Sequence, residues 1–165
     1  MFTQEKLIKQ SMNVIHRLSL RYSIPIPSIK LANNFGSAGK YLHRNNCILL
    51  DYNILKDIEP KLIINLLFHE WRHCWQYVKH TNNYLWWIKN YNIYNKLYPY
   101  CLIELDAYRF SSSNGVLDDN SLFEEFNIDK LNLLSQQHLL HQSMKELSYK
   151  IQFQEFEGHY FHPQG

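Results

Sequence analysis

The strongest constraint on the fold is a segment of helical periodicity that runs from about Pro60 to Lys79. Pro60 suits a first helical position, where the amide hydrogen that proline lacks would have no partner within the helix. Side chains that share one helical face then follow at three- and four-residue steps. They are Leu62, Leu66, His69, His73 and Gln76. The pattern predicts an amphipathic helix whose inward face carries two histidines.

The two histidines belong to the motif His69-Glu70-Trp71-Arg72-His73, which reads H-E-x-x-H. Imidazoles four residues apart project from one helical face towards a common point, as a metal ion requires. Glu70 lies about 100° further round the helix, so it can reach a water on the ion without being a ligand. The motif predicts a metal site with a neighbouring base. The alternative is a helix that carries buried histidines and a surface glutamate.

A catalytic zinc ion usually takes three protein ligands, so another one is needed. His80 shares the face of His73 but lies about 10 Å further along the helix axis, which is too far for one ion. The helical segment 104–110 offers Glu104 and Asp106, which lie about 200° apart round a helix, so that only one can face the ion. Ala107 favours Glu104, because a small residue on that face lets two helices approach closely. Asp106 is the alternative ligand.

The motif and a helical E-x-D/E-A-x-x-F about thirty residues later together resemble the gluzincin metallopeptidases. The likeness is greatest to the small minigluzincin, ImmA/IrrE-like and SprT-like groups, and it covers residues 28–112. It implies an α+β zincin-like fold. In chain order its elements are an N-terminal helix, a small three-stranded antiparallel sheet, the active-site helix, the glutamate helix and C-terminal helices. It also implies that His69, His73 and Glu104 hold Zn²⁺ and that Glu70 is the catalytic base.

One position departs from the family pattern. Many gluzincins have an aspartate four residues after the ligand glutamate, where this chain has Tyr108. A phenol can accept a hydrogen bond from an imidazole N–H or donate one to a substrate oxyanion, so Tyr108 is expected to support a ligand or to act in catalysis. Tyr98 and Tyr100 are alternative donors to the oxyanion. Asp106, where it is not a ligand, is expected to support one.

Short β-like runs between residues 28 and 51 predict the sheet. A turn at 44–46 predicts a hairpin between the last two strands. A first helix, capped by Thr3, precedes them and ends before Pro25. The resemblance places a substrate-pairing edge strand at 39–43, which makes Lys40, Tyr41 and Leu42 candidate substrate-binding residues.

The C-terminal part predicts a helical cover over residues 121–155 of a single domain, 1–165. Its last helix is expected to begin near Asp129. The apolar residues of that helix recur on one face; they are Leu133, Leu140, Met144, Leu147 and Ile151. His138 and His141 are expected to form a second metal site or to be solvated or capping histidines. The aromatic stretch 84–98 lines a peptide cleft or belongs to the core.

Composition narrows the class of protein. A chain of 165 residues with 45% hydrophobic residues is expected to form one ordinary globular domain. A net charge of +2 without a basic run gives no electrostatic footprint for nucleic acid. Neither a signal peptide nor a membrane-spanning apolar run is evident. Three cysteines without a C-x-x-C pair predict the reduced, buried thiols of a cytoplasmic protein.

The sequence therefore predicts a zinc-dependent endopeptidase that hydrolyses a protein or peptide substrate with a metal-activated water and Glu70 as general base. The first alternative is a catalytically silent zincin-like module that recognises a partner protein. The second is a regulatory peptidase that cuts a repressor, without direct contact to nucleic acid.

Overall fold

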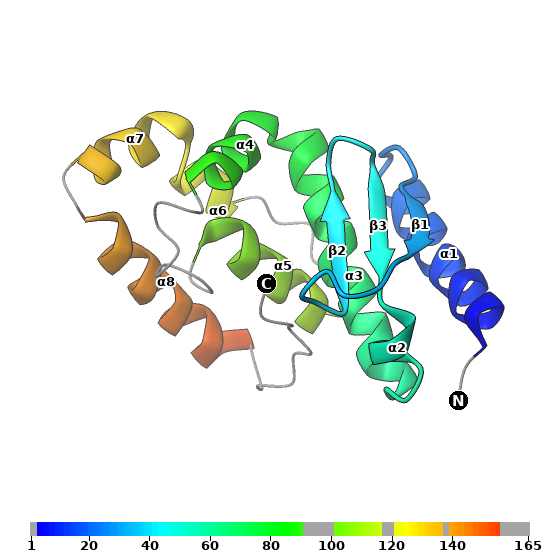
Figure 1. Cartoon of the computed structure of the whole chain (residues 1–165). Helices are drawn as coiled ribbons and strands as arrows, with labels where there is room; N and C mark the ends of the chain where they lie inside the picture. Colours follow the sequence, from blue (N-terminus) through cyan, green and yellow to red (C-terminus); the bar gives the residue numbers. More distant parts are fainter. Residues whose placement is uncertain (1–2, 91–100, 117–120, 137–138, 156–165) are drawn as a thin grey trace. The chain divides into compact units, whose positions relative to one another are not determined.

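The computed structural model describes residues 3–90, 101–116, 121–136 and 139–155. Their fold is α+β, with helices and a small mixed sheet (Figure 1). In chain order the elements are α1 (Gln4–Arg21), β1 (Ser28–Leu31), β2 (Gly39–Leu42), β3 (Cys47–Leu50), α2 (Tyr52–Leu55), α3 (Pro60–Lys79), α4 (Thr81–Asn90), α5 (Leu102–Ser112), α6 (Ser121–Glu125), α7 (Ile128–Gln136) and α8 (Leu140–Glu155). The chain divides into two compact units at residue 75, so that α3 begins in the first unit and ends in the second.

The first unit is built on α1, which begins where the sequence predicts. The side chain of Thr3 accepts a hydrogen bond of 3.1 Å from the amide of Lys6, and this satisfies one of the free donors of the first turn. The inner face of α1 is buried, and there the indole Nε1–H of Trp71 donates to Oγ of Ser19 at 3.0 Å. This bond fixes α1 against the middle of α3.

The sheet of the first unit has the strand order β1-β3-β2 (Figure 1). The hairpin of β2 and β3 is antiparallel, as predicted, and Asn46 in its turn adopts a left-handed φ of 45°. The prediction of a wholly antiparallel sheet is wrong, because β1 pairs with β3 in parallel. The connection 32–38 places β2 one strand position away from β1. The hairpin then brings β3 back between the two, where it runs parallel to β1. This order leaves β2 as an edge strand.

A short helix that the sequence did not predict follows the sheet. Asp51 caps α2 by accepting a hydrogen bond of 3.0 Å from the amide of Asn53, and it also accepts one of 3.1 Å from the amide of Asn34. A four-residue helix is too short to show periodicity, which is why only its cap could have revealed it. Asp51 thereby ties the end of β3 to the connection between β1 and β2.

In the second unit, α5 contacts α4, α6 and α8. The prediction of one long final helix is wrong, because α7 and α8 are separate helices. Leu133, expected on the inner face, is exposed, while Leu131 is buried. Of the aromatic stretch, Tyr84 and Trp87 are buried, which supports the core interpretation for these two residues. Residues 91–100 and His138 lie outside the described residues.

None of the helices in the described ranges combines the length and the apolar character that crossing a bilayer requires. The longest of them, α3, carries buried polar side chains, among them Glu70, Arg72 and Gln76. These polar groups, in the middle of an otherwise apolar helix, are the part of the fold that calls for a chemical explanation.

Candidate metal centre

The middle of α3 is buried on all sides. His69 is 4% exposed, Glu70 5% and His73 6%, and every residue from 69 to 76 is buried. Burial of the histidines agrees with the predicted inward face. Burial of Glu70 argues against the alternative of a surface glutamate, because a carboxylate is seldom buried without a partner or a function.

The two imidazoles have the spacing of zinc ligands. Their Nε2 atoms lie 3.3 Å apart, and the ring planes are inclined at 84°. Tetrahedral zinc with bonds of about 2.1 Å to nitrogen separates two ligand atoms by about 3.4 Å. Binding through Nε2 requires the proton of each neutral ring to be on Nδ1. The separation of the two nitrogens is compatible with their binding one metal ion.

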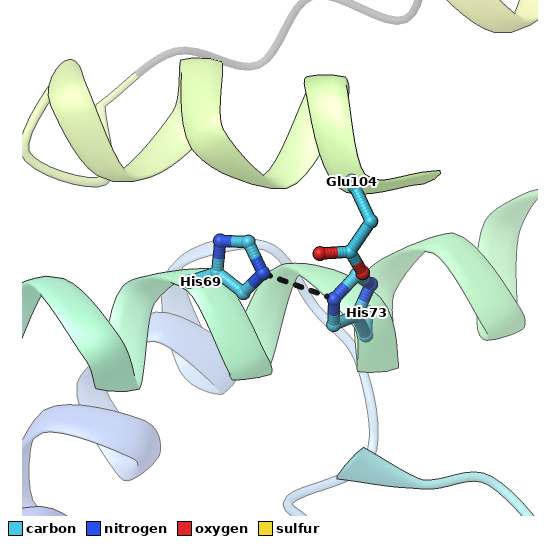
Figure 2. Close-up of side chains that lie close together, drawn as sticks. All are labelled: His69, His73 and Glu104. Carbon is cyan, nitrogen blue, oxygen red and sulfur yellow. Dashed lines mark hydrogen bonds between the residues drawn. The ribbon is translucent and has the colours of Figure 1, made fainter. Parts of the chain in front are cut away.

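Glu104 lies in the first turn of α5 and has the third potential ligand atom. Ligand atoms of His69, His73 and Glu104 all lie within 4.8 Å of one another. Figure 2 draws the imidazoles of His69 and His73 on α3 and the carboxylate of Glu104 on α5. Among the described residues this group contains Glu104 and not Asp106. Ala107 is itself fully buried.

His80 is not part of this group. Its ring stacks on Phe123, with ring centroids 4.5 Å apart and an angle of 9° between the planes. α3 ends at Lys79 and α4 begins at Thr81, so His80 lies at the junction of two helices.

Asp106 is engaged elsewhere. The side-chain amide of Gln76 donates one hydrogen bond of 2.8 Å to Oδ2 of Asp106 and another of 2.8 Å to the carbonyl of Ile103. Gln76 and Asp106 are both fully buried or nearly so. Asp106 therefore joins α5 to the end of α3.

Glu70 lies against the beginning of the edge strand. A Cβ atom built on Gly39 would be 3.3 Å from Cγ of Glu70 and 3.2 Å from two methyl groups of Leu66. A side chain at this position would require Leu66 or Glu70 to shift by a few tenths of an ångström. The absence of a side chain at position 39 thus brings the candidate base next to the strand that was expected to bind substrate.

The remaining strand residues have distinct surroundings. Lys40 is exposed, Leu42 is half-buried, and Tyr41 is buried, with its hydroxyl donating a hydrogen bond of 3.0 Å to Oδ1 of Asn46. All three lie on β2, whose outer edge has no neighbouring strand in the described sheet. Tyr41 therefore stabilises the hairpin, and its ring is not an exposed subsite.

Tyr108 lies on α5 and is half-buried, with its carbonyl accepting a hydrogen bond of 3.0 Å from Oγ of Ser111. Its role as a support of a ligand or as an oxyanion donor stays a prediction. The alternative donors Tyr98 and Tyr100 lie outside the described residues.

The cysteines do not belong to the candidate centre. All three are free and buried, as predicted. Burial raises the pKa of the Cys74 thiol to about 11, although a hydrogen bond with Tyr41 opposes the shift. Burial, and then the negative charge of Glu104, raise the pKa of Cys101 well above its ordinary value. Both thiols therefore keep their protons at neutral pH in the metal-free chain.

Two residues near the centre were not assigned a role from the sequence. Gly39 belongs to a glycine-punctuated stretch, and a glycine inside a strand signals a close approach of another group. Gln76 continues the helical face of His69 and His73. This pattern indicated that Gln76 lies near the two histidines, but it did not indicate which groups Gln76 bonds to. The partners of both residues are distant in the sequence, so only the folded chain reveals them.

No protein-family model, no curated protein and no solved structure matches this chain.

Proposed function

We propose that the protein is a zinc-dependent endopeptidase. The observation that carries the proposal is the 3.3 Å separation of the His69 and His73 Nε2 atoms on a helix whose next residue, Glu70, is a buried carboxylate. These two nitrogens and a carboxylate oxygen of Glu104 would hold the ion. Bound Zn²⁺ would polarise the scissile carbonyl and lower the pKa of a water molecule to about 7.

Glu70 is the general base in this proposal. Its carboxylate accepts a proton from the attacking water and returns it to the departing amine when the peptide bond breaks. Because Glu70 is buried, bulk water screens its charge less than it would at the surface, and its electrostatic effect is larger. The proton therefore passes from the attacking water to Glu70 and from Glu70 to the departing amine, and no base from the solvent is needed.

The number of ligands favours the enzyme over the binding module. Within the described residues, the group of potential ligands has three members. Structural zinc sites have four protein ligands, whereas catalytic sites have three and leave a position for water or substrate. The three-residue group supports the catalytic interpretation.

The edge of β2 supports a peptide as the substrate. An extended peptide can pair with an edge strand through backbone hydrogen bonds, and such pairing depends little on the sequence of the peptide. Gly39 at the start of β2 lies beside Glu70, so a peptide on Lys40, Tyr41 and Leu42 would run next to the base. We propose an unfolded or extended protein segment as substrate. The reduced thiols favour a cytoplasmic location.

The test is cleavage of unfolded casein by zinc-loaded protein, followed by gel electrophoresis and by mass spectrometry of the products. We expect cleavage by the unaltered chain and none by Glu70→Gln at the same zinc content. An unaltered chain that binds zinc stoichiometrically and leaves casein, and a set of other unfolded proteins, intact would refute the peptidase and favour the binding module.

A further inference from the structure

Gln76 makes two hydrogen bonds to α5, on either side of Glu104. Its Nε2 donates to the carbonyl of Ile103, one residue before Glu104, and to Oδ2 of Asp106, two residues after it. Both distances are 2.8 Å, and all four residues lie in the second unit. The amide thus uses both of its N–H groups to bracket the residue that would ligate zinc.

These bonds are well suited to control position. Gln76 is fully buried and Asp106 nearly so, and a bond from an amide to a carboxylate inside a protein is stronger than one between neutral groups. The bond to Ile103 fixes the backbone of the first turn of α5. The bond to Asp106 fixes a side chain three residues later, about one helical turn further along. Together they restrict both the sliding and the rotation of α5, which would otherwise move the carboxylate of Glu104.

The chemistry of the residue type matters as well. A neutral amide positions its acceptors without contributing a charge that would compete for the ion. A glutamate at position 76 would have the same shape, but when ionised it could not donate and would repel Asp106. An amide is therefore the side chain that satisfies both acceptors.

We infer that Gln76 is a positioning residue that holds Glu104 in place for zinc through Ile103 and Asp106. The inference deepens the proposed function and depends on its metal centre. Gln76 would raise the affinity for the metal without binding the metal itself. Groups that orient ligands in this way typically affect metal affinity by about 10- to 100-fold.

The test is a double-mutant cycle on the full chain, with the dissociation constant for Zn²⁺ alone measured by competition with a chromophoric chelator. We expect Gln76→Leu to weaken zinc binding about 10- to 100-fold in the unaltered background. In the Glu104→Ala background the same substitution should weaken it less than about 2-fold, because the residue on which Gln76 acts is gone. Equal losses in both backgrounds, or no loss in the first, would overturn the inference.

A matched control separates positioning from general destabilisation. Asn83 is a buried amide of the same unit, and its Nδ2 donates to the carbonyl of Phe126 at 2.6 Å. Asn83→Leu should lower the unfolding free energy as Gln76→Leu does, yet leave the zinc dissociation constant within about 2-fold of the unaltered value. A loss of zinc affinity as large as that of Gln76→Leu would show that any destabilisation of this unit suffices, and would also overturn the inference.

A second pair of variants covers the case in which Gln76→Leu does not fold. Asp106→Asn keeps an oxygen that accepts the hydrogen bond from Gln76, whereas Asp106→Leu removes it. We expect the asparagine variant to bind zinc nearly as tightly as the unaltered chain and the leucine variant to bind it about 10-fold more weakly. Equal affinity in the two variants would contradict the inference. Since zinc affinity is measured without turnover, a chain that follows this cycle but cleaves nothing would refute only the peptidase.

Discussion

Gly39 lies close beside Glu70: a Cβ atom at position 39 would lie 3.3 Å from Cγ of the glutamate. This distance is shorter than ordinary van der Waals contact between carbon atoms. The contact joins an edge strand of the sheet to the candidate base on α3. It therefore relates two features that are 31 residues apart in the sequence, a glycine in a β segment and the glutamate of H-E-x-x-H.

Gly39→Ala is expected to reduce peptidase activity more than zinc affinity. The added methyl group would meet Leu66 and Glu70, and insertion of an extra methyl group into a packed contact costs about 1–3 kcal/mol. If the variant relieves the contact by moving Glu70, kcat should fall about 10-fold or more, because misplacement of a base by a fraction of an ångström slows proton transfer. The measurement is kcat and the zinc dissociation constant of the same preparation.

Gly36→Ala is the control for this substitution. Gly36 has a left-handed φ of 87°, and a Cβ atom there would meet nothing within 4 Å. Alanine at this position should cost about 1 kcal/mol through backbone strain alone. Its kcat should stay within about 2-fold of the unaltered value, since Glu70 is untouched. A parallel loss of kcat in both variants would assign the effect to a weakened loop and not to the base.

Glu70→Gln is expected to abolish hydrolysis and to retain zinc. Glutamine has the same shape but cannot accept the proton of water, so kcat should fall by about 10²- to 10⁴-fold or more. His69→Ala and His73→Ala should instead lose the metal and the activity together. Zinc content by atomic absorption and initial rates of casein cleavage separate the two patterns. Residual cleavage by pure Glu70→Gln at more than about a tenth of the normal rate would be incompatible with Glu70 as the base.

The starts of helices α1 and α3 were predictable because their signals are local. Thr3 caps α1, and Pro60 begins α3 at the expected residue. These signals act between residues of one turn, so no tertiary information is needed. The partner of β1 was not predictable in this way. Whether β1 pairs with β2 or with β3 depends on how the connection 32–38 crosses the sheet, and no local pattern encodes that path.

The candidate site also has a part that local sequence signals predict and a part that they do not. The convergence of His69 and His73 follows from helical geometry alone, and the preference for Glu104 over Asp106 followed from the small residue Ala107. The hydrogen bonds of Gln76 and the contact of Gly39 join residues distant in the sequence. Sequence periodicity identifies which face of a helix is inward, but it does not identify the atoms that this face meets.

Removal of the metal is expected to inactivate and destabilise the protein. A chelator such as 1,10-phenanthroline should abolish cleavage, and stoichiometric Zn²⁺ should restore it. Free zinc at 100 times its dissociation constant stabilises the native state by about 2.7 kcal/mol, which for a chain of this size is a rise in Tm of about 5–10 °C. Differential scanning calorimetry of apo and zinc-loaded protein measures this rise. A Tm that does not depend on zinc would contradict binding to the folded chain.

Cys74 should make the stability of the protein depend on alkaline pH. Burial raises the pKa of its thiol from an ordinary 9.0 to about 11, so between these values the native state keeps a proton that the unfolded chain has lost. The resulting stabilisation is fully present below pH 9 and is lost as pH rises to 11, by roughly 2–3 kcal/mol in all. Cys74→Ala removes the titrating group, and its small cavity lowers stability equally at every pH. The free energy of unfolding in urea, measured from pH 8 to 11 for both proteins, should therefore fall more steeply for the unaltered chain. Parallel curves would show that the thiol titrates alike in the folded and unfolded states.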